Sequence, residues 1–172
     1  MNITEESDYD VRYSNQDDFP FLHKWLGECR KWYPVSSDKD VEAMAKNWIG
    51  FYRYGASLTA VYKKQPVGIA TLFLMPYRKV IHHCLVYFIV DPKHARKGVG
   101  TSLIKNIDHL GKSYFRFEWM NIETFEGCPA IPLIEKAGYE QVFKQEKFVK
   151  EKEGYLARHL YQINFSKDQN GK

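Results

Sequence analysis

The chain has 172 residues, 44% of them hydrophobic and 16% aromatic, which is enough for one compact domain with a sizeable core. A formal net charge of +4 is too small to indicate nucleic-acid binding by itself. Three widely spaced cysteines without a Cys-x-x-Cys disfavour a disulfide framework or a zinc site, and are typical of a reducing compartment. MNITEESDYD lacks the features of a signal peptide, and no apolar run approaches the roughly 18 residues that span a bilayer. We therefore expect a cytoplasmic protein that does not enter the membrane.

The chain is predicted to begin with a short strand and a helix. Residues 1–9 are polar and expected to be frayed, and residues 10–15 form the strand. Asp17 or Asp18 then caps a helix that carries Pro20 in its first turn. The apolar face of this helix consists of Leu22, Trp25, Leu26 and Cys29.

A second helix has a clearer start. Ser37 and Asp40 form a pattern similar to a capping box, and Gly55 ends the helix. Apolar residues at helical spacing form its buried face: Val41, Met44, Ala45, Trp48, Ile49 and Tyr52.

From residue 57 the spacing and type of the apolar residues become those of β-strands. Residues 57–62 and 67–75 are rich in β-formers and are joined by four residues, so they predict an antiparallel hairpin. A third strand covers residues 80–90, and its second half is continuously apolar, which is typical of a central strand buried on both faces.

The second half of the chain contains one clear amphipathic helix and several strands. The remaining elements are expected to be a helix over 99–110 that Gly111 ends, a strand over 115–120 parallel to the third strand, a short helix over 129–138, a hairpin of 139–149 and 155–165, and a disordered tail from residue 166. With no linker or repeat, we predict a single domain over 1–172 with an ordered core of about 10–165.

The glycine loop, residues 95–101, connects the third strand to the amphipathic helix. Several backbone N–H groups and a positive helix end come together here, which suits a pyrophosphate, and Gly98 and Gly100 allow the backbone to approach it. The alternative is a tight strand-to-helix turn without a ligand. The loop is neither a P-loop nor a dinucleotide-binding Gly-x-Gly-x-x-Gly, because Leu103 occupies the third glycine position.

With this element order and two motifs, the chain resembles the GNAT superfamily of acyl-CoA-dependent N-acyltransferases over about residues 10–165. The family's Gln/Arg-x-x-Gly-x-Gly/Ala motif corresponds to residues 95–100. A second signature, near Asn-x-x-Ala-x-x-Leu-Tyr-x-x-x-Gly-Phe, falls on Gly127, Ala130, Leu133, Ile134, Gly138 and Tyr139. The resemblance implies an α/β fold: a mixed, mostly antiparallel twisted sheet of six to seven strands, about four flanking helices and a splayed parallel strand pair at the centre.

The resemblance also implies a binding site for acetyl-CoA and no metal. Pantetheine would run between the splayed strands along Ile89 and Val90. The pyrophosphate would lie on the glycine loop, against Arg96, Lys97, Gly98, Val99, Gly100 and Thr101. An amine would attack the thioester directly, and a backbone N–H near Val90 would polarise its carbonyl.

Several departures from the family pattern affect proton transfer. Ala95 replaces the first motif residue, and Ile134 replaces a tyrosine that protonates the departing thiolate in many members. The third strand lacks the family's glutamate and offers only His82, His83, Cys84 and Tyr87. His83 and Glu123 are therefore the candidate bases, although each also fits an ordinary packed or solvated side chain.

Other candidates are weaker. Cys128 has no sequence signal for a partner base, which disfavours a nucleophile. Trp32, Tyr33 and Tyr54 lie outside the periodic helix faces and are candidates for the acceptor site.

The sequence thus predicts an N-acetyltransferase that acts on a small-molecule or peptide amine. The alternative is a catalytically weakened acyl-CoA-binding or regulatory module. A nucleic-acid binder is disfavoured because the basic charge is local and no aromatic residues interleave it. The long final hairpin could support a homodimer.

Overall fold

The computed structural model describes residues 8–166, so the predictions for residues 1–7 and 167–172 lie outside the described residues. A seven-stranded sheet has the order β1-β2-β3-β4-β5-β7-β6, and four α-helices flank it. The strands are β1 (Tyr9–Tyr13), β2 (Ser57–Tyr62), β3 (Gln65–Leu74), β4 (His83–Val90), β5 (Trp119–Phe125), β6 (Glu140–Glu151) and β7 (Gly154–Asn164). The helices are α1 (Phe19–Glu28), α2 (Asp38–Ile49), α3 (Val99–His109) and α4 (Ile131–Lys136). Among the described pairs only β4 and β5 run parallel, which confirms the predicted fold class.

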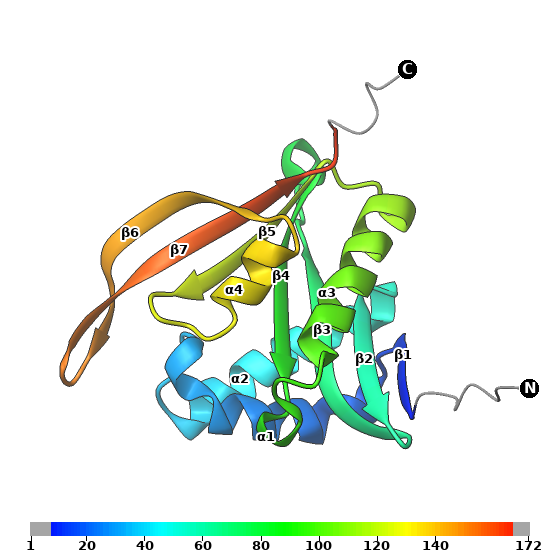
Figure 1. Cartoon of the computed structure of the whole chain (residues 1–172), viewed down its shortest axis with the longest axis horizontal. Coiled ribbons are helices and arrows are strands. Elements are labelled where there is room, and N and C mark those ends of the chain that lie inside the picture. Colours follow the sequence, from blue (N-terminus) through cyan, green and yellow to red (C-terminus); the bar gives the residue numbers. More distant parts are fainter. Residues whose placement is uncertain (1–7, 167–172) are drawn as a thin grey trace, which may run out of the picture.

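The helices cover both faces of the sheet (Figure 1). On one face α3 and α4 pack over a core that includes Val86 of β4 and Ile122 of β5. On the other face α1 and α2 bury Trp25 and Trp48 against Ile69 and Ile89. The predicted apolar helix faces therefore point to the sheet. No helix in residues 8–166 has the length and apolar character needed to cross a membrane.

The two N-terminal helices begin differently from one another. Ser37 and Asp40 form the predicted capping box of α2. Asp18 precedes α1, and no side chain caps that helix at this position. Asp18 is 1% exposed, and its carboxylate accepts hydrogen bonds from Arg12 at 2.8 and 2.9 Å, from Thr59 at 2.8 Å and from the Asn15 N–H at 3.0 Å, the last within a capping box of the short 3-10 helix Gln16–Asp18. Burial alone would raise the pKa of Asp18, but these bonds lower it. The predicted cap thus forms an ion pair between the partly exposed Arg12 of β1 and the buried Asp18 just before α1.

The strand after α3 lies later than predicted. Residues 110–114 continue the helix as a π-turn, and β5 begins only at Trp119. Gly111 therefore does not end the helix; it lets the helix approach β5, because a Cβ here would clash with Met120 Sδ. The alternating aromatic residues that predicted a strand, Phe115 and Phe117, stack on each other at 5.6 Å.

The parallel strands β4 and β5 separate part-way along their length. Paired residues run from His83 with Trp119 to Val86 with Ile122, and both strands continue for several residues beyond the last pair. Asn121 reinforces the paired part by donating a hydrogen bond to the Cys84 carbonyl at 3.1 Å. We call the first unpaired position the apex of the splay.

The final hairpin of β6 and β7 projects beyond the body of the protein (Figure 1). Strand β6 forms an edge of the sheet, and its pairing with β7 shifts register twice. A small shift lies between Gln141 and Phe143, and a larger bulge places residues 146–148 between the pairs Gln145–Arg158 and Val149–Leu156. Lys147 in this bulge has a φ of 54°. The hairpin was predicted, but the bulge was not.

Candidate active site

A pocket of about 620 Å³ occupies the splay between β4 and β5. One wall is formed by residues 86–90 of β4 and the other by residues 122–124 of β5. The glycine loop closes one end, and Trp32, Tyr33 and the segment 128–134 cover the pocket. The pocket therefore joins the two motifs that are far apart in the sequence.

The glycine loop presents an open helix start to this pocket. Gly98 has a φ of 84° and precedes α3, and the first N–H groups of an α-helix have no partners within the helix. Gly100 lies close to α4, because a Cβ here would be 3.3 Å from Leu133 Cδ1. Arg96, Gly98, Gly100 and Thr101 line the pocket, whereas Lys97 is exposed and Val99 is buried in the core. The structure thus brings together four of the six predicted loop residues.

The backbone of β4 offers a donor to the pocket. Tyr33 Oη donates a 2.6 Å hydrogen bond to the Phe88 carbonyl, so that carbonyl points away from β3, whereas Asp91 N–H bonds Val67 of β3. In an antiparallel ladder the N–H and C=O of one residue point to the same side. The N–H groups of Phe88 and Val90 therefore point into the splay, while the N–H group and the carbonyl of Ile89 point to β3. Ile89 still lines the pocket.

Tyr87 and Glu123 are the first residues beyond the last β4–β5 pair, so they mark the apex. Both line the pocket. Burial raises the pKa of the Glu123 carboxyl, although Arg158, with Nη1 at 3.9 Å, opposes the shift. Burial and the Glu123 carboxylate raise the pKa of Tyr87. The apex thus combines a carboxylate and a phenol at the end of the splay opposite the glycine loop.

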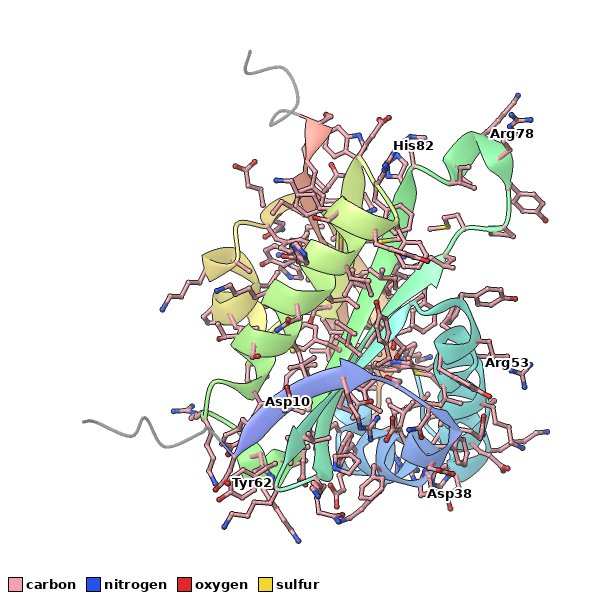
Figure 2. The ribbon with its side chains drawn as sticks, turned by 90° about the vertical axis from the view of Figure 1, so that its right-hand side faces the viewer. Asp10, Asp38, Arg53, Tyr62, Arg78 and His82 are labelled. Carbon is pink, nitrogen blue, oxygen red and sulfur yellow. The ribbon has the colours of Figure 1, made fainter. Side chains whose placement is uncertain are left out.

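His83 lies at the start of β4, away from the pocket. It pairs with Trp119, three positions before the last pair, and its ring stacks on Trp119 at 6.2 Å. Burial and the neighbouring His82 lower the pKa of His83, and Glu118 opposes this. Figure 2 shows His82, the residue before it, at the end of the sheet opposite Tyr62. Of the two candidate bases, only Glu123 lines the pocket.

The other side chains that the sequence suggested for the site also fall into two groups, those that line the pocket and those that lie outside it. Trp32, Tyr33 and Cys128 line the pocket, whereas Tyr54 is 66% exposed in the 3-10 helix after α2 and does not. Ile134 lines the pocket and is buried, so the position of the expected tyrosine holds no proton donor. Within residues 8–166 no group of three His, Cys, Asp or Glu side chains could hold a metal ion.

A family model described as the Acetyltransferase (GNAT) family matches residues 19–139, which include both walls of the pocket. The chain belongs to the GNAT family. Its fold also matches solved acetyltransferase structures at low sequence identity. The Salmonella typhimurium protein yncA, solved with its cofactor acetyl-CoA, has a TM-score of 0.79 and 12% identity, covering 92% of this chain and 94% of that chain.

Two further acetyltransferase structures show the same fold. The ribosomal-protein-alanine N-acetyltransferase from Brucella melitensis has a TM-score of 0.75 and 17% identity, over 91% of this chain and 99% of that chain. The ribosomal-protein-S18-alanine N-acetyltransferase from Escherichia coli has a TM-score of 0.68 and 15% identity, over 91% and 93%. No curated protein sequence matches the chain. These identities establish the fold of this GNAT protein and leave its acceptor open.

Proposed function

We propose that this protein transfers the acetyl group of acetyl-CoA to an amine by direct attack, with Glu123 as the base. One observation carries the proposal: a single pocket connects the glycine loop to the apex that holds Glu123. A long ligand with an anionic end and a reactive end would find a complementary group at each end of this pocket.

The glycine loop suits the anionic end of the co-substrate. The free N–H groups at the start of α3 and the positive end of its dipole attract a pyrophosphate, and Arg96 adds a full positive charge. The rest of the pocket has apolar walls, including Val86, Ile122 and Leu133, which suit a pantetheine arm. These residues fit acetyl-CoA without contribution from the missing loop side chain at Ala95.

The apex suits the reaction itself. A lysine-like amine with a pKa of about 10.4 costs roughly 4.6 kcal/mol to deprotonate at pH 7, so a base is needed. The raised pKa of Glu123 brings this carboxylate closer to the operating pH, which improves its match to a general base. The Phe88 N–H, directed into the splay, would donate to the oxygen of the attacked carbonyl.

Thiol release tests the proposal. Purified protein is incubated with acetyl-CoA and a panel of small amines, amino acids and peptide amino termini, and free thiol is measured. We expect at least one amine to release thiol. Glu123→Gln should lower kcat about 100-fold or more, within the usual range for loss of a general base, without changing the affinity for acetyl-CoA. Glu126→Gln, a neighbouring exposed carboxylate, should leave both unchanged.

A binding module is the second candidate, and Ile134 in the pocket favours it because it cannot donate a proton. Tight binding of acetyl-CoA with no thiol release for any amine would assign this function instead. Absence of acetyl-CoA binding in a calorimetric titration would refute both candidates.

A further inference from the structure

Tyr87 stands where a ligand arm in the splay must end. Strands β4 and β5 are hydrogen-bonded up to Val86 and Ile122, so an extended chain lying between them from the glycine loop can reach no further than the apex. Tyr87 and Glu123 are the next residues on the two strands. Both side chains alternate to the face opposite Val86 and Ile122, which point to α3 and α4. The reactive end of the arm therefore lies beside both side chains.

The Tyr87 ring is fixed but its hydroxyl is not engaged. The ring packs against Phe73 at 5.0 Å and Trp48 at 5.6 Å. Within the described part of the chain, the Tyr87 hydroxyl has no hydrogen-bond partner, whereas the Tyr33 hydroxyl, also in the pocket, is bonded to the Phe88 carbonyl. A half-buried hydroxyl without a partner gains from a ligand that accepts its hydrogen bond.

Tyr87 also separates two hollows. The cofactor pocket lies on one side, and a second hollow of about 380 Å³, bounded by Val35, Met44 and Phe73, lies on the other. Among the residues that the structure describes, Tyr87 alone lines both hollows. An amine entering from the second hollow would meet the thioester at this side chain.

Several other lining residues do not offer a comparable donor at the apex. Thr101 lies at the glycine-loop end, Ile134 has no donor, and the thiols of Cys29 and Cys128 are weak donors. Burial and the Glu123 carboxylate raise the pKa of Tyr87, so its hydroxyl stays protonated over the whole physiological range. It is therefore a permanent hydrogen-bond donor that keeps its own proton.

We propose that the Tyr87 hydroxyl donates a hydrogen bond to the departing sulfur of acetyl-CoA, in place of the donor that Ile134 cannot supply. The inference rests on the proposed acetyl transfer. The amine nitrogen forms a bond to the acetyl carbon, and the carbon–sulfur bond breaks with its electron pair on sulfur. An ammonium substrate first loses one proton through Glu123 to solvent, which gives the neutral amine that attacks. After the attack Glu123 accepts the second proton from the new amide nitrogen and returns it to the thiolate, which leaves as the thiol. Tyr87 stabilises the negative charge on sulfur between these steps.

Tyr87→Phe tests this role, because it removes the hydroxyl and keeps the packed ring. With acetyl-CoA and the best amine of the panel, we expect kcat to fall about 10- to 100-fold and KM for acetyl-CoA to stay the same. Tyr52→Phe is the matched control; Tyr52 packs in the same core cluster and lines neither hollow, so its variant should keep wild-type activity. Equal thermal midpoints of Tyr87→Phe and wild type would establish that the variant folds.

A leaving-group comparison separates a donor from a structural residue. The same assays are run with the acetyl thioester of 4-nitrothiophenol, whose thiolate is stable without a donor. We expect the loss caused by Tyr87→Phe to shrink to less than about threefold with this substrate. An equal loss with both thioesters, or no loss with acetyl-CoA, would overturn the role of Tyr87. If wild type is active and depends on Glu123 while Tyr87→Phe is fully active, only this inference fails; if wild type releases no thiol, the proposed function fails with it.

Discussion

Asp108 should make the folding stability of the protein fall with rising pH, and one substitution should remove this dependence. This carboxyl on α3 is half-buried and accepts a 2.6 Å hydrogen bond from the Tyr139 hydroxyl. Burial raises the pKa of Asp108 from 3.8 to about 7, although the hydrogen bond from Tyr139 opposes the shift. Because the folded protein binds this proton more tightly than the unfolded chain, its stability falls as the pH rises from about 4 to about 7.

The size of the effect follows from the shift. A rise from 3.8 to about 7, at about 1.36 kcal/mol per pH unit, corresponds to about 4 kcal/mol of lost folding free energy above pH 7. Partial exposure of the site reduces this, so we expect Asp108→Asn to stabilise the protein by about 2–4 kcal/mol at pH 8. The asparagine oxygen can still accept the hydrogen bond from Tyr139. For a chain of this size the gain corresponds to about 5–12 °C in Tm.

Urea unfolding of wild type and Asp108→Asn between pH 4.5 and 8.5 measures the effect. The two proteins should have similar stability at pH 4.5 and diverge as the pH rises toward 7. Glu151→Gln, which removes an exposed carboxylate from β6, should follow wild type throughout. Parallel curves for wild type and Asp108→Asn, or lower stability of the variant at pH 8, would refute the reasoning.

Three further predictions concern other parts of the fold. Gly68→Ala should lower the free energy of unfolding, measured in urea, by about 1–3 kcal/mol, because its Cβ would lie 2.9 Å from a leucine methyl and 3.0 Å from a carbonyl oxygen. The control Gly27→Ala, in a helix with open space around the position, should be neutral or stabilising by up to about 1 kcal/mol. Gly98→Ala should weaken acetyl-CoA binding about tenfold in calorimetry, because φ of 84° strains a residue with a Cβ by roughly 1–2 kcal/mol; unchanged affinity would contradict the role of the loop. Arg12→Gln should destabilise the protein by about 1–3 kcal/mol at pH 7, because it leaves the buried Asp18 carboxylate without its ion pair, and the gap should narrow as the pH falls through the lowered pKa of Asp18.

Most of the fold was predictable because hydrophobic periods and caps agree with the tertiary structure. The capping box at Ser37 and the apolar strand that ends at Val90 were both placed correctly. The strand after α3 was predicted too early in the chain. The apolar–polar alternation within β5 is broken by polar residues that are buried because they have hydrogen-bond partners on neighbouring strands. Asn121, for example, bonds the Cys84 carbonyl and accepts from Gln162 at 2.8 Å. Single-sequence patterns do not show such partners.

The sequence named residues at both ends of the pocket, the glycine loop at one end and Glu123 at the other, but it did not bring Tyr87 together with Glu123. The glycine loop can be recognised from the sequence because its glycines and the start of the following helix are adjacent residues. The apex, in contrast, is formed by Tyr87 and Glu123, which are 36 positions apart and meet only through the β4–β5 register. His83 lies in the same strand as Tyr87 but within the paired part of β4, three positions before the last β4–β5 pair, and therefore away from the apex. The strand register is the information that the sequence alone does not supply.

The bulge in β6 bears on how the projecting hairpin avoids self-association. An edge strand of twelve residues would otherwise offer a long row of free backbone groups on which further strands could add. Residues 146–148 interrupt that row near its middle and bring Glu146 and Lys147 to the interruption. A dimer or a growing fibre across this edge could then use only the short segments on either side. The bulge therefore shortens the stretch of β6 to which a further strand could add.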